Sequence, residues 1–327
     1  MEDKKAGIEY PLRSVIITGP TGSIGTALIR LCIENNVRVV AVVRPDSGRI
    51  ANIPSDPLVQ VVRLGLEQIS KLPDMQGVSG DVFIHLGWAG TFGDSRNDTA
   101  TQYANIGYSL LAVQAAHILR CHTFIGAGSQ AEYGRAEGTL KPDTPVNPEN
   151  GYGIAKLCAG QMTRLLCAQL GIRHIWTRIL SVYGPCDGEG TLISSLLRCF
   201  QEGSVLETTK GEQIWDYLYS EDAARAIFLL AEKGLDQKTY CIGSGQGRAL
   251  KSYMTEAAEA AQKIVNAGSN EKDYVNCIEF GKRSYAPNQV MHLVADISEL
   301  SKDTGFEPAV NFDEGIQKTL QWMQEIG

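Results

Sequence analysis

The 327-residue sequence predicts an α/β fold, in which a doubly wound parallel sheet carries a smaller C-terminal lobe. Short β-branched runs alternate with amphipathic helical stretches through the first half of the chain, as expected for repeated βαβ units. A glycine-rich turn joins the first strand to its helix, and beyond residue 185 the pattern becomes irregular. We therefore assign residues 1–175 mainly to the sheet domain and residues 176–327 mainly to the lobe, with some of the later segments returning to the sheet.

Composition excludes several classes of protein. Apolar residues make up 43% of the chain and charged residues 20%, which is ordinary for a globular protein. The net charge of −7 and the lack of a basic block argue against a nucleic-acid partner. The sequence has neither an apolar signal core nor a run of 18 apolar residues, so we expect a cytoplasmic protein without a membrane partner. Its scattered cysteines and histidines predict buried thiols and no metal site.

The glycine-rich turn lies between a strand predicted over residues 14–18 and a helix predicted over residues 23–34. A second buried strand is predicted over residues 37–43. In this setting, glycines allow a tight turn and a close approach of the backbone to a pyrophosphate, whose charge meets the free N–H groups of the helix N-terminus. The spacing is G-x-x-G-x-x-G, formed by Gly19, Gly22 and Gly25. We therefore expect the first domain to bind a dinucleotide.

The residues after the second strand bear on the choice of cofactor. An NAD site usually offers an acid to the adenosine ribose at this point, but here Arg44 follows the strand. A guanidinium group suits a 2′-phosphate through bidentate hydrogen bonds, so the sequence favours NADP. Asp46 keeps NAD open as the alternative, because its carboxylate can reach a ribose hydroxyl.

Two further buried strands are predicted over residues 81–86 and 122–127, with a helix over residues 99–119 between them. Ligands collect at the C-terminal ends of such parallel strands, which is where Trp88 is found. Asn105 lies within the otherwise apolar face of the helix. It is either a core polar residue with satisfied hydrogen bonds or part of an active-site scaffold, and the sequence leaves both open.

Tyr152 and Lys156 lie four residues apart at the beginning of a predicted helix, which places both side chains on one helix face. A phenol has an ordinary pKa of about 10, and a nearby ammonium group lowers it by favouring the phenolate. The pair would then exchange a proton with a carbinol or carbonyl oxygen. The same spacing also occurs on ordinary amphipathic helices, so its weight comes from the motifs around it.

Taken together, the motifs resemble the extended short-chain dehydrogenase/reductase family, in its nucleotide-sugar epimerase, dehydratase and ketoreductase branch. The resemblance spans nearly the whole chain in the order of that family. Its pieces are TGPTGSIG at 18–25, DVFIHLG at 81–87, YANIG around Asn105, SQAEYG at 129–134, YGIAK at 152–156, RILSVYGP at 178–185, DYLYSEDAARAI at 216–227, CIGSG at 241–245 and DISELSKDTGFEPAV at 296–310.

The resemblance implies a Rossmann-type fold, a homodimer and a catalytic triad. In that triad Ser129 would polarise the substrate oxygen, Tyr152 would pass the proton, and Lys156 would bind the nicotinamide ribose and lower the tyrosine pKa. The residues expected to bind the cofactor are Gly19, Thr21, Gly22, Ser23, Ile24, Gly25, Arg44, Leu86, Gly87, Tyr152 and Lys156. Those expected to bind the substrate are Trp88, Gln130, Ser181 and Tyr183, and the arginines considered for its diphosphate are Arg178, Arg248 and Arg283.

Three departures from the family pattern bear on the reaction and on the nucleotide of the substrate. Dehydratases of this branch carry Asp-Glu directly after the catalytic hydroxyl residue, whereas this chain has Gln130 and Ala131, neither of which is an acid or a base. Ser181 replaces the usual Asn before Val-Tyr-Gly-Pro, and Trp215 replaces the usual Arg before Asp-Tyr. The first departure disfavours 4,6-dehydration, and the other two leave the nucleotide open.

These observations favour an NAD(P)-dependent 4-ketoreductase of a nucleotide-linked 4-keto-6-deoxysugar. A 4-epimerase that retains NAD is the alternative, because it oxidises and re-reduces the same carbon with the same residues. A non-catalytic dinucleotide sensor of the same fold is disfavoured, since such relatives typically lose the Tyr or the Lys.

Overall fold

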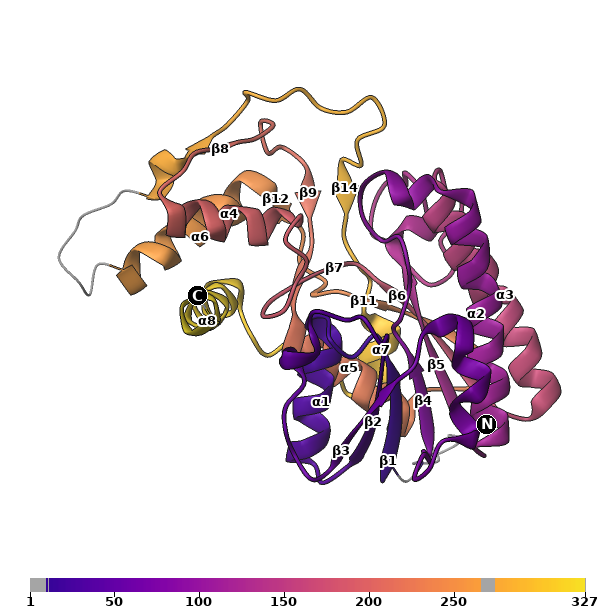
Figure 1. Cartoon of the computed structure of the whole chain (residues 1–327). Helices are drawn as coiled ribbons and strands as arrows, with labels where there is room; N and C mark the ends of the chain where they lie inside the picture. The colour runs from indigo at the N-terminus through magenta and orange to yellow at the C-terminus, as the bar shows by residue number, and fades with distance from the viewer. Residues whose placement is uncertain (1–9, 11, 266–273, 327) are drawn as a thin grey trace.

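The computed structural model describes residue 10, residues 12–265 and residues 274–326. Most of the polar N-terminal segment therefore lies outside the described residues. Within them, seven parallel strands form one sheet in the order β11-β6-β5-β4-β1-β2-β3 (Figure 1). The strands are β1 (Ser14–Thr18), β2 (Arg38–Val43), β3 (Val59–Arg63), β4 (Val82–His85), β5 (Thr123–Ser129), β6 (Arg173–Ile179) and β11 (Lys238–Ile242). The predicted doubly wound sheet is confirmed.

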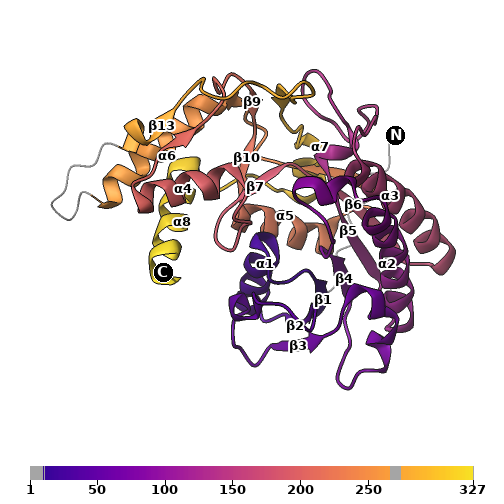
Figure 2. The same ribbon diagram turned by 45° about the horizontal axis from the view of Figure 1, so that its top comes forward.

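Helices cover both faces of the sheet because its strands are apolar on both sides. In β1, Val15 and Ile17 pack into one core cluster, while Ile16 between them packs into the other. Figure 2 shows the two helical layers on either side of the strands. The first layer contains α1 (Ser23–Glu34), α5 (Ser220–Lys233) and α7 (Ser298–Thr304), and the second contains η2 (Leu66–Asp74), α2 (Thr99–Ile118) and α3 (Gly151–Leu170).

Helix α3 begins and ends at residues whose chemistry fixes its boundaries. The side chain of Asn150 accepts a hydrogen bond from Gly153 N at 2.8 Å, which caps the first turn. Gly171 ends the helix in the left-handed region, with φ of 69°. Because the cap stands two residues before Tyr152, it sets the position at which that side chain leaves the helix.

The C-terminal lobe has its own apolar core, formed where α4 (Leu192–Glu202), α6 (Leu250–Val265) and α8 (Phe312–Ile326) meet the short helix η5 (Tyr274–Cys277). It lies to one side of the sheet domain in Figure 1. Paired short strands complete it: β7 (Ser181–Tyr183) with β10 (Tyr217–Tyr219), β8 (Leu206–Glu207) with β13 (Ile278–Glu279), and β9 (Ile214–Trp215) with β12 (Arg248–Ala249) and β14 (His292–Leu293). Most of β6, together with α5, β11 and α7, falls within residues 176–327, the range assigned mainly to the lobe, yet packs in the sheet domain. In the described part of the chain, no helix has both the length and the apolar character needed to cross a membrane.

Candidate active site

A cavity of about 540 Å³ lies where β1, β4 and β5 end and the lobe begins. This volume is in the range of small-molecule sites. Most of the residues predicted to bind cofactor or substrate line it, namely Gly19, Gly22, Ser23, Ile24, Gly25, Leu86, Trp88, Ser129, Gln130, Tyr152, Lys156, Ser181 and Tyr183. Thr21, Arg44 and Gly87 are outside this lining. No group of three metal-binding side chains gathers among the residues that the structure describes.

The glycine turn has the shape that a pyrophosphate requires. Gly19 has φ of +69°, and a Cβ atom there would lie 2.8 Å from Gly87 N, so only glycine fits. A Cβ atom on Gly25 would lie 2.6 Å from Gly19 O, which lets α1 start close against the turn. The N-cap of α1 is Gly22, and no side chain caps this helix start. The first N–H groups of α1 are therefore open to an anion, and the turn fits a dinucleotide.

Arg44 lies at the surface just after β2. Its Nε is 3.6 Å from Asp46 Oδ1, and both side chains are largely exposed. The two residues that bear on the choice between NADP and NAD are thus neighbours at the same end of β2. Neither side chain is locked into the protein interior, so both remain able to meet a ligand.

The structure brings the three predicted catalytic residues into one cavity. Ser129 ends β5, while Tyr152 and Lys156 lie on the first two turns of α3. The Ser129 hydroxyl oxygen accepts a hydrogen bond from Ala131 N at 3.2 Å. The Lys156 side chain is buried, and its Nζ donates to Ala127 O at 2.6 Å.

The pKa of Tyr152 differs from the expectation. Burial raises it, and the Ser129 hydroxyl and the Arg96 guanidinium oppose this by favouring the phenolate. Arg96 lies 4.5 Å from the centre of the tyrosine ring, whereas Lys156 Nζ is 5.7 Å away and directed at Ala127 O. The expectation that the ammonium group makes this phenol acidic is therefore wrong for the protein alone. The phenol is therefore protonated at neutral pH.

The pKa of Lys156 is shifted in the direction expected for a buried cation. Burial lowers its pKa to about 7, and the negative charge of Glu132 partly opposes the change. The ammonium group is consequently close to its titration midpoint at neutral pH.

A buried ion pair supports the loop that carries Ser129, and the sequence reasoning missed it. Glu132 is fully buried and accepts hydrogen bonds from Ser129 N at 2.9 Å and from Arg178 Nε at 2.8 Å. Arg178 also donates to Pro142 O, so it is not the predicted diphosphate ligand. The Ser-x-x-Glu spacing of Ser129 and Glu132 is a capping box, and this was the local signal that could have revealed the role of Glu132.

Two of the departures from the family pattern contact each other. Trp215 Nε1 donates a hydrogen bond to Ser181 Oγ at 2.7 Å, and both residues line the lobe side of the cavity. Tyr183 is also there, and its hydroxyl donates to Phe312 O, so its proton is engaged within the lobe. Arg248 is engaged with Glu256 and is absent from the cavity lining.

Asn105 belongs to the scaffold of the site. Its side-chain oxygen accepts from Ala89 N at 3.0 Å, and its side-chain nitrogen donates to Ala89 O at 2.9 Å. Since the residue is buried, both hydrogen bonds form away from water. Asn105 thereby fixes the segment that follows β4 and carries Trp88.

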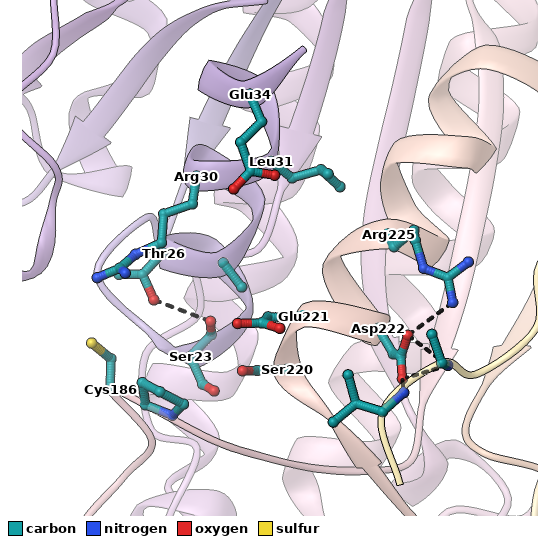
Figure 3. Close-up of a pocket in the computed structure, with 14 residues that line it drawn as sticks. Ser23, Thr26, Arg30, Leu31, Glu34, Cys186, Ser220, Glu221, Asp222 and Arg225 are labelled. Carbon is teal, nitrogen blue, oxygen red and sulfur yellow. Dashed lines mark hydrogen bonds and ion pairs between the residues drawn. The ribbon is translucent and has the colours of Figure 1, made fainter. Parts of the chain in front are cut away.

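A second cavity, of about 370 Å³, lies between α1 and α5 (Figure 3). Asp222 is one of the residues that line it. Its carboxylate accepts hydrogen bonds from Ala309 N and Val310 N and forms an ion pair with Arg225. These contacts anchor the chain that leads to α8. The tyrosine and lysine of the candidate triad are not in this wall, so the cavity of about 540 Å³ that they line is the candidate active site.

The fold and the site define an enzyme of the extended short-chain dehydrogenase/reductase type. The chain belongs to the NAD-dependent epimerase/dehydratase family, whose model matches residues 15–243. It is 24% identical to CDP-abequose synthase of Salmonella typhimurium over 322 residues, which cover 94% of this chain and 97% of that protein.

Other relatives share the family. The dTDP-glucose 4,6-dehydratase of Neisseria meningitidis is 25% identical over 341 residues, covering 95% of this chain and 93% of the relative. With the dehydratase of Shigella flexneri, the match spans about half of that protein, 48%, and 55% of this chain, at 28% identity. The solved structure of UDP-glucose 4-epimerase from Thermotoga maritima superposes with a TM-score of 0.81 at 21% identity, covering 96% of this chain and 99% of that one. This last likeness concerns the fold.

Proposed function

We propose that the protein reduces the C4 carbonyl of a nucleotide-linked 4-keto-6-deoxysugar with a reduced nicotinamide cofactor. The observation that carries the proposal is the meeting of Ser129, Tyr152 and Lys156 in one cavity with the uncapped glycine turn. Tyr152 is protonated at neutral pH, so it can give the proton that a reduction needs at the carbonyl oxygen. The similarity to CDP-abequose synthase over most of both chains supports a nucleotide-linked sugar as the substrate.

Each residue then has a defined task. Tyr152 gives its proton to the C4 oxygen, and Ser129 donates a hydrogen bond to the same oxygen, since its own Oγ already accepts from Ala131 N. Lys156 would hold the nicotinamide ribose, and the glycine turn would hold the pyrophosphate. The bound cofactor supplies the hydride chemistry, and the protein supplies orientation and proton transfer.

Two side chains argue against 4,6-dehydration. Gln130 and Ala131 occupy the positions where the dehydratases of this branch carry their acids, and Gln130 lines the cavity as a neutral hydrogen-bonding residue. A proton for a leaving C6 hydroxyl therefore has no donor at these positions. On the lobe side, Trp215 offers a flat ring suited to a base or a sugar face.

The alternative is a 4-epimerase with retained NAD, which would use the same three residues in both directions. The two activities differ in whether the purified protein retains bound NAD and in whether it consumes added reduced cofactor. We expect exchangeable reduced cofactor to be oxidised when the protein meets a panel of nucleotide-linked 4-keto sugars, as followed by the loss of nicotinamide absorbance. Tightly retained NAD, with interconversion of C4 epimers and no net oxidation of added cofactor, would instead identify the epimerase.

Arg44 provides a test of cofactor choice. We expect Arg44→Ala to weaken NADPH binding roughly 10- to 100-fold, as a charged hydrogen bond worth about 1.5–3 kcal/mol would predict, and to change NADH binding little. Arg38→Ala is the matched control, because Arg38 lies at the opposite end of β2. Titration of each variant with both cofactors measures the effect, and equal changes for NADPH and NADH would leave Arg44 without a role in the choice.

We propose a homodimer formed through the outer faces of α2 and α3. Both helices expose apolar side chains there at intervals of one or more turns, among them Tyr103 at 78%, Leu165 at 59% and Ile154 at 55% exposure. Leu165→Glu should convert the dimer to a monomer in light scattering, since the charge would have to be buried. Leu235→Glu, a substitution of an exposed leucine outside these helices, should leave the dimer intact. A wild-type monomer would contradict the proposal.

A further inference from the structure

Lys156 is a buried cation with few groups to compensate its charge. Its Nζ donates to Ala127 O at 2.6 Å, and Glu132, the acid whose charge acts on it, is already paired with Arg178. An aromatic ring also faces the ammonium group: Nζ lies 3.8 Å from the ring centre of Trp88. Tryptophan has the strongest cation-binding face among the aromatic side chains, and the attraction increases when water is excluded.

The indole of Trp88 is held in place by Gln102, a buried residue of α2. Trp88 Nε1 donates to Gln102 Oε1 at 2.9 Å. The amide nitrogen of Gln102 donates to Gly90 O at 2.8 Å and to Ser95 O at 3.0 Å. Gly90 has φ of +70°, and a Cβ atom there would lie 2.9 Å from this nitrogen. Gln102 thus holds Trp88, Gly90 and Ser95, three residues of the connection between β4 and α2.

We propose that Trp88, held by Gln102, is a positioning residue for Lys156, and that its indole face keeps the ammonium group charged and beside Tyr152. The same ring meets Tyr152 edge-on, with 6.1 Å between ring centres and an interplanar angle of 84°. One side chain therefore orients both members of the pair. The inference rests on the proposed function to the extent that Lys156 acts there as a cation.

Three other charged or titratable groups, each on a different element, act on the pair. His85 on β4 is neutral at neutral pH, because burial and the charge of Lys156 lower its pKa to about 3. Glu132 opposes the effect of burial on Lys156, and Arg96 stacks on Tyr152. Burial still dominates and lowers the pKa of Lys156 to about 7. Removal of the indole face would lower this pKa further, so Lys156 would lose its proton at a lower pH.

The titration of Lys156 can be followed directly by NMR of the protein labelled with ¹³C at the ε carbons of lysine, without substrate or cofactor. We expect its signal to titrate near pH 7, because burial lowers the pKa of Lys156, and to be assigned by its loss in Lys156→Met. In Trp88→Leu we expect the midpoint to fall by about one pH unit, the scale of a desolvated cation–π contact. In Trp88→Phe, which keeps a weaker aromatic face, we expect a fall of a few tenths of a unit.

An unchanged midpoint in a folded Trp88→Leu protein would overturn the proposal. Should that variant fail to fold by circular dichroism, Trp88→Phe decides the question, and an unchanged or higher midpoint there would overturn it. Gln102→Leu, which removes the acceptor of the indole N–H, should shift the midpoint in the same direction as Trp88→Leu. Because the measurement needs no turnover, it separates a failure of this inference from a failure to reduce any sugar in the panel.

Discussion

Replacing Tyr152 by phenylalanine is expected to lower kcat by about 10²–10⁴-fold, the usual contribution of a general acid or base. The phenyl ring keeps the contacts with Trp88 and Arg96, so the cavity and the cofactor affinity should change little. What is lost is the phenolic proton that Tyr152 would give to the C4 oxygen. The assay compares kcat on the best substrate of the panel with the affinity for the cofactor, measured by titration.

A matched control is Tyr285→Phe, which removes a hydroxyl that contacts Glu212 in the lobe, outside the cavity and outside α2 and α3. This variant should retain wild-type kcat. If Tyr152→Phe turned over at a similar rate, the proton would have to come from another group, and the role given to Tyr152 would be wrong.

The second large effect concerns stability. Glu132→Gln should lower the free energy of unfolding by about 3–5 kcal/mol, because it leaves the buried Arg178 guanidinium without its counter-charge. The exposed pair of Arg135 and Glu149 is the control, and Glu149→Gln should cost no more than about 1 kcal/mol. Urea unfolding of the two variants measures the difference. Equal losses in the free energy of unfolding would contradict the expectation that burial makes the Glu132–Arg178 pair costlier to break.

The strands and helices of the first half of the chain were largely predictable from the sequence, for a physical reason. Buried strands and their helices in βαβ units carry strong local patterns, so the strand predicted over residues 14–18 is β1, and the helix predicted over residues 23–34 is α1. The edge strand β3 was not predicted, because most of its side chains are exposed and its pattern is weak. The two-residue strands of the lobe were not predicted individually either, because they depend on pairing with distant segments.

The site was predictable as a set of residues but not as a set of contacts. Glycine spacing and the Tyr152–Lys156 interval are local, and the structure places these residues in one cavity. The contact of Glu132 with Arg178 joins residues 46 positions apart, and no spacing rule indicates it. The predicted direction of the pKa shift of Tyr152 was wrong, because the shift depends on burial and on the position of Lys156 Nζ. These are properties of the packed structure.

The most direct test of the central claim is to follow the hydride itself. We would incubate the protein with a nucleotide-linked 4-keto-6-deoxysugar and nicotinamide cofactor carrying deuterium at the transferable C4 position, and locate the label in the product by NMR. Transfer of deuterium to C4 of the sugar, slowed by about 10²–10⁴-fold in Tyr152→Phe, is the predicted result. A product formed without label at C4, or label at another carbon, would contradict reduction at this position.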